Sequence, residues 1–219
     1  NDIKRYLSNS EIFNIFKDNK RILLFLFENK FVAINESVIR HIIADKYVDA
    51  KYPQYFLPEI KPFIKEKWFP KFKESQREYF PHENEWVQEI EREIPENFNE
   101  LRTLGENDSY ICKLIRNDSI EEFIQFVNKN NYSLRSQISQ SVYETNSFLI
   151  KKQIESKNSD KKVTLIKYAA FFGAIQILRY LKYNGIDLNS DLLEFAIHSQ
   201  DAEIINLLEE INTGNNSFQ

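Results

Sequence analysis

The chain has 219 residues and a formal net charge of −4, with basic and acidic residues mixed along its length. This balance excludes the strongly basic face typical of nucleic-acid-binding proteins, so we expect no nucleic-acid partner. Glycine is scarce, with four residues in all, and apolar residues recur at helical spacing, which together favour an all-α fold.

Residues 1–104 are predicted to form an irregular helical region. Apolar residues between Ile12 and Phe16 fit one face of a helix. The run Ile22–Phe27 is compatible with a helix or a β-strand, and we favour the helix because its neighbours have helical periodicity. This run is the longest apolar block and is far too short to cross a bilayer, so we expect no membrane insertion.

Residues 52–81 contain five prolines among many aromatic residues and lysines. Prolines at this density break helices into short pieces. One interpretation is an exposed contact patch for an acidic protein, with Trp68, Lys67 and Lys71 among its contact residues. The other, which we favour, is that the aromatic side chains fill an internal joint. An amphipathic helix is then predicted from Trp86 to Ile94.

The segment from Thr164 to Gly173 has the pattern of a helix that packs closely on its neighbours. Thr164 is placed to cap the helix, and Gly173 suits the left-handed backbone that ends it. Two alanines, Ala169 and Ala170, allow a neighbouring helix to approach. Three further apolar residues then line a second helix: Ile177, Leu178 and Leu181.

The same pattern recurs along the C-terminal half, which predicts four helix pairs spaced by about 27 residues. The position of Gly173 is taken by Asp118, Asn146 and Gln200 in the other pairs. Asp and Asn tolerate left-handed backbone, whereas Gln does not, so the turn at Gln200 is expected to differ. The pair around Asn146 fits the pattern poorly.

Thr164, Ala169, Ala170 and Gly173 together resemble the first helix of the ankyrin repeat. Leu165 and Lys167 depart from the Pro and His of that motif. The segment from Gly105 to about Ile211 more closely resembles a divergent ankyrin-type family that is expanded in trichomonad protists and has no assigned activity. The stretches that carry this resemblance are Gly105–Asp108, Ile115–Asp118, Tyr143–Asn146, Tyr168–Gly173 and Ala196–Ser199.

The resemblance implies an ankyrin-like α-solenoid over residues 105–211. The irregular region 1–104 precedes it, and residues 212–219 are expected to form a flexible tail. It also implies a non-enzymatic scaffold that binds other proteins through the concave face of the array. The residues placed on that face are Lys167, Phe171, Phe172, Glu194, His198 and Asn146.

Two alternatives stay open. One is a structural component of a large cytoskeletal or flagellar assembly, in which the lysines between 61 and 73 meet acidic tubulin surfaces. The other is an enzyme, but the sequence has no metal-binding HExxH motif and no glycine-rich phosphate loop. We therefore expect no catalytic residues, no metal and no cofactor.

Cys112 is the single cysteine, so no internal disulfide can form, and it is predicted to be a buried apolar residue. No signal peptide opens the sequence. Both observations favour a reducing cytoplasmic setting, with association to the cytoskeleton in the assembly alternative. The sequence contains no methionine, and we expect it to be a fragment or a processed form.

Overall fold

The computed structural model describes residues 6–44, 51–63, 94–155, 162–189 and 191–215. Within these ranges the secondary structure is helical apart from one isolated antiparallel bridge between Gln137 and Thr164, which confirms the all-α prediction. Trp68, Lys67, Lys71 and most of the helix predicted from Trp86 lie outside the described residues.

The chain divides into two compact units, and each contains segments from two parts of the sequence. Unit 1 comprises residues 1–106 and 140–151, and unit 2 comprises residues 107–139 and 152–219. The predicted domain boundary at residue 104 stays a prediction. Residues 140–151 group with the N-terminal helices in unit 1.

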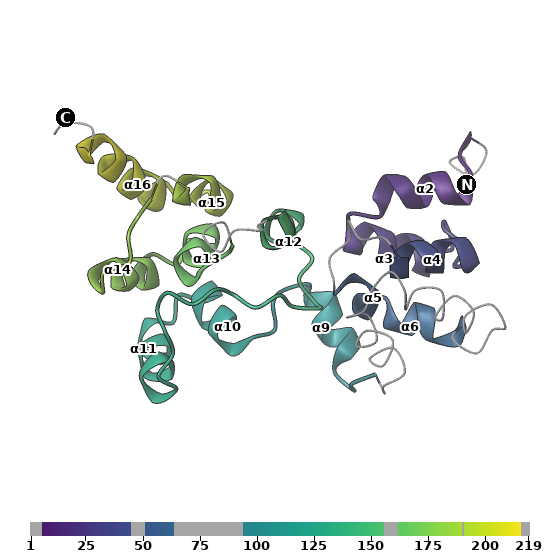
Figure 1. Cartoon of the computed structure of the whole chain (residues 1–219), viewed down its shortest axis with the longest axis horizontal. Coiled ribbons are helices and arrows are strands. Elements are labelled where there is room, and N and C mark those ends of the chain that lie inside the picture. The colour runs from purple at the N-terminus through teal and green to yellow at the C-terminus, as the bar shows by residue number, and fades with distance from the viewer. Residues whose placement is uncertain (1–5, 45–50, 64–93, 156–161, 190, 216–219) are drawn as a thin grey trace. The chain divides into compact units, whose positions relative to one another are not determined.

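Unit 1 is built from short helices around an aromatic and aliphatic core (Figure 1). Ile22–Phe27 lies in a helix, as predicted. The Ser8 hydroxyl and the Glu11 carboxylate form a capping box at the start of the first described helix. Pro53 and Pro58 occupy the first turns of two four-residue helices, where a missing amide hydrogen costs nothing. The helices are α2 (Asn9–Phe16), α3 (Lys20–Glu28), α4 (Glu36–Ala44), α5 (Tyr52–Tyr55), α6 (Leu57–Ile60), η1 (Lys61–Phe63) and α9 (Phe98–Leu104).

Two buried basic side chains fasten distant segments of unit 1. The Lys20 ammonium group donates to the carbonyl oxygens of Val142 (3.2 Å) and Glu144 (3.1 Å), which ties the 140–151 segment to α3. Arg102 forms an ion pair of 2.8 Å with Glu59 and also donates to the Tyr55 carbonyl. Each pairing satisfies a charge that would be costly to bury alone.

Unit 2 consists mainly of helix pairs that follow one another in space (Figure 1). The first helices of the pairs pack in succession, α10 on α13 and α13 on α15, and the second helices α11 and α14 also contact each other. The helices are α10 (Tyr110–Arg116), α11 (Ile120–Lys129), α13 (Leu165–Phe172), α14 (Ile175–Tyr183), α15 (Leu192–Ser199) and α16 (Ala202–Asn215). Because α16 runs to Asn215, helical structure extends into the predicted tail.

The turn inside each pair has the same left-handed backbone. Gly173 has a φ of 75°, as predicted, and Asp118 has a φ of 47°. Gln200 has a φ of 55°, so the prediction of a different turn there was wrong. The helix-to-helix geometry of the pair therefore overrides the local preference of glutamine, which ordinarily avoids this region.

The fourth predicted pair, around Asn146, does not exist. Asn146 has no left-handed backbone; its side-chain oxygen accepts from the amides of Phe148 (3.1 Å) and Leu149 (3.2 Å), which caps α12 (Ser147–Glu155). The Ile138 amide donates to the Val163 carbonyl at 2.8 Å, and residues 140–151, which lie between these two in the sequence, belong to unit 1. The α10–α11 pair consequently packs directly on the α13–α14 pair.

Thr164 occupies the N-cap position of α13, but its hydroxyl forms no capping bond and has no partner among the described residues. The predicted role of its side chain was therefore wrong. Its backbone instead contributes to the bridge with Gln137, and the Leu165 amide donates to the Ser136 carbonyl at 3.2 Å. The start of α13 is held by this strand-like pairing.

Candidate protein-interaction surface

The helix pairs of unit 2 share one register, which decides which way each position faces. Arg116 of α10 donates to the Tyr168 hydroxyl at 2.9 Å, so the Tyr168 position faces the preceding helix. Residues two apart on a helix are rotated by about 200° around the helix axis, so they point to nearly opposite sides. The Ala170 position therefore faces the following helix, α15, and Ala170 is fully buried there.

The residues predicted to bind a partner differ in how exposed their side chains are. Lys167 and Phe171 are buried, with exposed fractions of 4% and 7%. Phe172 is half-buried, whereas Glu194 and His198 are exposed. Asn146 belongs to unit 1, and the other five residues belong to unit 2. The role of these residues in binding stays a prediction, which now depends on the exposed residues among them.

Aromatic contacts hold the exposed part of this surface in place. The His198 ring stacks on Phe171 with a centroid distance of 5.0 Å, and Phe171 packs edge-on against Phe172 at 4.9 Å. The Arg116 guanidinium lies 6.0 Å from the centre of the Phe172 ring. His198 and Phe172 are thus presented by rigid helices.

Two lysines, Lys167 and Lys152, make contacts within unit 2. The Lys167 ammonium group lies 5.7 Å above the Phe195 ring, inside the helix stack. The Lys152 ammonium group pairs with the Glu194 carboxylate at 2.7 Å. Glu194 therefore already has an ion pair within the chain, and a partner that uses it must compete with Lys152.

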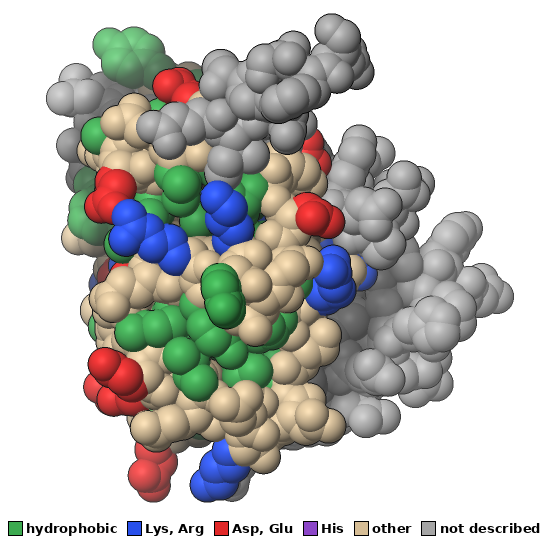
Figure 2. Space-filling view, turned by 90° about the vertical axis from the view of Figure 1, so that its left-hand side faces the viewer, with side chains coloured by type: hydrophobic (Ala, Val, Ile, Leu, Met, Phe, Trp, Pro, Cys, Tyr) green, Lys and Arg blue, Asp and Glu red, His purple; other side chains and the backbone are tan. Residues whose placement is uncertain are grey.

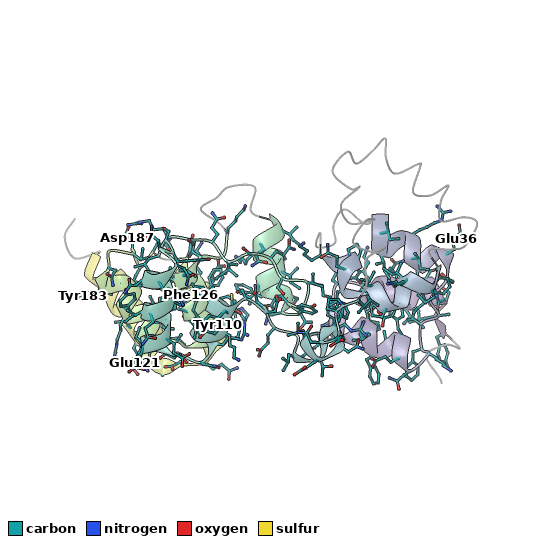
Figure 3. The ribbon with its side chains drawn as sticks, turned by 90° about the horizontal axis from the view of Figure 1, so that it is seen from below. Glu36, Tyr110, Glu121, Phe126, Tyr183 and Asp187 are labelled. Atoms are coloured by element: carbon teal, nitrogen blue, oxygen red, sulfur yellow. The ribbon has the colours of Figure 1, made fainter. Side chains whose placement is uncertain are left out.

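The sequence reasoning missed two exposed aromatic residues of unit 2, Tyr110 on α10 and Tyr183 on α14. Figure 2 shows hydrophobic side chains gathered on one side of unit 2, with acidic and basic side chains around them. Tyr110 and Phe126 lie beside each other in Figure 3, with ring centroids 5.3 Å apart, and Phe126 also approaches Tyr132. Tyr183 is 91% exposed. Tyr110 and Tyr183 lie outside their helices' buried stripes, a signal present in the sequence.

No group of three His, Cys, Asp or Glu side chains lies close enough to hold a metal in the described ranges. Cys112 is fully buried, as predicted. No described helix combines the length and the apolar character needed to cross a membrane.

No protein-family model, curated protein or solved structure matches this chain.

Proposed function

We propose that this chain is a non-enzymatic protein-binding module and that unit 2 is a divergent ankyrin-like array. The observation that carries the proposal is the common register of three helix pairs. In each pair a residue with left-handed backbone forms the turn between the two helices, and successive pairs pack on each other. Such arrays are rigid along their length and present side chains at fixed spacing, which suits the recognition of another folded protein.

The binding surface in this proposal is the exposed edge of the first helices α13 and α15, with His198 and Phe172 as its central residues. Both are aromatic, and both are fixed by packing, so a partner gains contact area with little loss of side-chain entropy. Glu194 lies on the same helix as His198 and adds a charged rim.

The test is site-specific photo-cross-linking of the whole protein in native extract. Benzoylphenylalanine replaces His198 in one variant and Gln125, an exposed residue in the middle of α11, in a matched control. We expect one reproducible protein adduct from position 198 that is absent from position 125. Equal adduct patterns at the two positions, with unchanged helicity by circular dichroism, would overturn the proposal.

The assembly alternative stays a prediction, because most of the lysine-rich segment that motivated it lies outside the described residues. The same experiment separates the two hypotheses. An adduct with a filament-forming protein, together with co-sedimentation of this chain with the polymer, favours the assembly role. A reducing intracellular setting is part of the proposal and is supported by the single buried cysteine.

A further inference from the structure

The outward side of α11 carries one acidic and one basic residue on either side of an aromatic residue. Glu122, Phe126 and Lys129 follow one another at spacings of four and three residues, which keeps them on one stripe of the helix. Glu122 and Lys129 are exposed, and Phe126 is half-buried. The acidic residue lies in the first turn and the basic residue in the last turn of α11.

The two charges have no opposite charge beside them within the chain. Glu122 and Lys129 form no ion pair with any residue that the structure describes. Two other exposed carboxylates of unit 2, those of Glu194 and Glu203, are paired with basic side chains of other helices. The charges on α11 therefore stay available to a partner molecule.

An aromatic cluster occupies the middle of the same stripe. The Phe126 ring lies between two tyrosines, with ring centroids 5.3 Å from Tyr110 and 6.0 Å from Tyr132 (Figure 3). Tyr110, at the start of α10, is 52% exposed, and its hydroxyl lies 3.5 Å from the Glu122 carboxylate. Tyr110, Glu122, Phe126, Lys129 and Tyr132 are here called the α11 stripe. Exposed aromatic side chains with charges around them are typical of protein interfaces.

The order of the charges along α11 fits a second copy of the same stripe. Glu122 lies three residues before Gln125, and Lys129 lies three residues after Phe126. If two α11 helices lie antiparallel across a two-fold axis between positions 125 and 126, each Glu122 faces Lys129 of the other copy. A two-fold interface brings one patch onto itself, so it requires this kind of self-complementarity. A wholly acidic or wholly basic partner would instead place a like charge against one end of the stripe.

We propose that the α11 stripe is the contact surface of a two-fold symmetric dimer of this chain. The aromatic side chains of Tyr110 and Phe126 from both copies form its centre, and an ion pair between Glu122 and Lys129 of the other copy lies on each side. The antiparallel arrangement also sets the positive N-terminal end of each helix beside the negative C-terminal end of the other. The dimer goes beyond the proposed function and uses a different surface from His198 and Phe172.

The experiment measures self-association of the full chain by sedimentation velocity over a series of protein concentrations. The variants are Lys129→Glu, Glu122→Lys and the two substitutions together. Each single reversal sets like charges against each other at both sides of the interface, so we expect dimerisation to weaken about tenfold or more. The double reversal restores two opposite-charge pairs and should recover most of the wild-type affinity. Added salt should weaken the wild-type dimer.

Two pairs of variants locate the interface. Lys182→Glu is the matched control for Lys129→Glu, because Lys182 is also an exposed lysine in the last turn of a second helix, and it should leave dimerisation unchanged. Tyr110→Ser should weaken the dimer, whereas Tyr183→Ser, at an exposed tyrosine of α14, should not. Unfolding midpoints measured by circular dichroism show whether each variant keeps its fold.

Three outcomes would overturn the inference: a wild-type chain that stays monomeric at every concentration, equal effects of Lys129→Glu and Lys182→Glu, or a folded double reversal that dimerises as weakly as the single reversals. The proposed function fails separately, because it predicts a partner adduct at position 198 whether or not the chain dimerises. A cross-link from position 125 to a second copy would support the dimer and would leave the result at position 198 unaffected.

Discussion

Asp118 and Ile177 are 59 residues apart in the sequence, yet the Asp118 carboxylate accepts a hydrogen bond from the Ile177 backbone amide at 3.0 Å. Its second oxygen accepts from the Gln176 amide, also at 3.0 Å. The N-cap residue of α14 is Ala174, which has no side-chain acceptor. A residue in the turn of one helix pair thus caps the second helix of the next pair.

Replacing Asp118 by alanine should lower the free energy of unfolding by about 1–2 kcal/mol, the usual cost of losing a helix cap. Alanine also tolerates the left-handed backbone of this position poorly. Asp118→Asn is the control, since asparagine accepts this backbone and keeps one acceptor oxygen, and it should lose less. Urea unfolding followed by circular dichroism measures both, and equal stability of the alanine variant and wild type would contradict the capping role.

Gln200→Gly should raise the free energy of unfolding by about 1 kcal/mol. Glutamine at a φ of 55° pays a steric cost that glycine does not, and the position directly follows α15, where glycine is favoured. Gln125→Gly, in the middle of α11, should instead lose about 1 kcal/mol. Opposite shifts in the urea midpoint support the turn geometry, and a destabilised Gln200→Gly would count against it.

Ala169→Glu should destabilise unit 2 by about 3 kcal/mol or more, because Ala169 is fully buried on a helix that lies between α10 and α15. The control is Ala202→Glu, an exposed residue in the first turn of α16, where a carboxylate is favourable. Thermal unfolding should separate the two clearly. A wild-type melting curve for Ala169→Glu would mean that the helix register described above is incorrect.

Tyr55 makes the stability of unit 1 sensitive to alkaline pH. Burial raises the pKa of Tyr55 to about 12, so the folded state favours the neutral phenol. The resulting contribution of Tyr55 to the free energy of unfolding is fully present below the ordinary tyrosine pKa of about 10 and is lost as the pH rises through 12. The free energy of unfolding of the wild-type protein should therefore fall by up to about 2 kcal/mol between pH 10 and pH 12. The Tyr55→Phe variant should not show this loss.

The same variant has a second readout at neutral pH. The Tyr55 hydroxyl is buried without a hydrogen-bond partner among the described residues, so its removal should cost nothing and is expected to stabilise the protein slightly. Urea unfolding at pH 7 and pH 11 gives both numbers. Parallel losses in wild type and Tyr55→Phe across this range would show that other groups control alkaline unfolding.

Local sequence patterns determined the helices of this protein and the turn at Gly173. Apolar spacing of 3.6 residues and the backbone freedom of glycine act within a few residues, so they can be recognised without a structure. The burial of Ala169 also followed from its pattern, because small residues mark close helix contacts. Cys112 was correctly predicted to be buried because it lies on a helix face beside Ile111 and Leu114.

Only the tertiary structure decided which of the segments that match the repeat pattern form helix pairs. Residues 140–151 fit the repeat pattern poorly, and contacts with Lys20 and the unit 1 core hold them, so no repeat forms there. Gln200 adopts a left-handed backbone because its two helices are fixed by their neighbours, and Lys167 is buried because α15 packs beside it. These outcomes depend on contacts between residues far apart in the chain, which outweigh local preferences of about 1 kcal/mol.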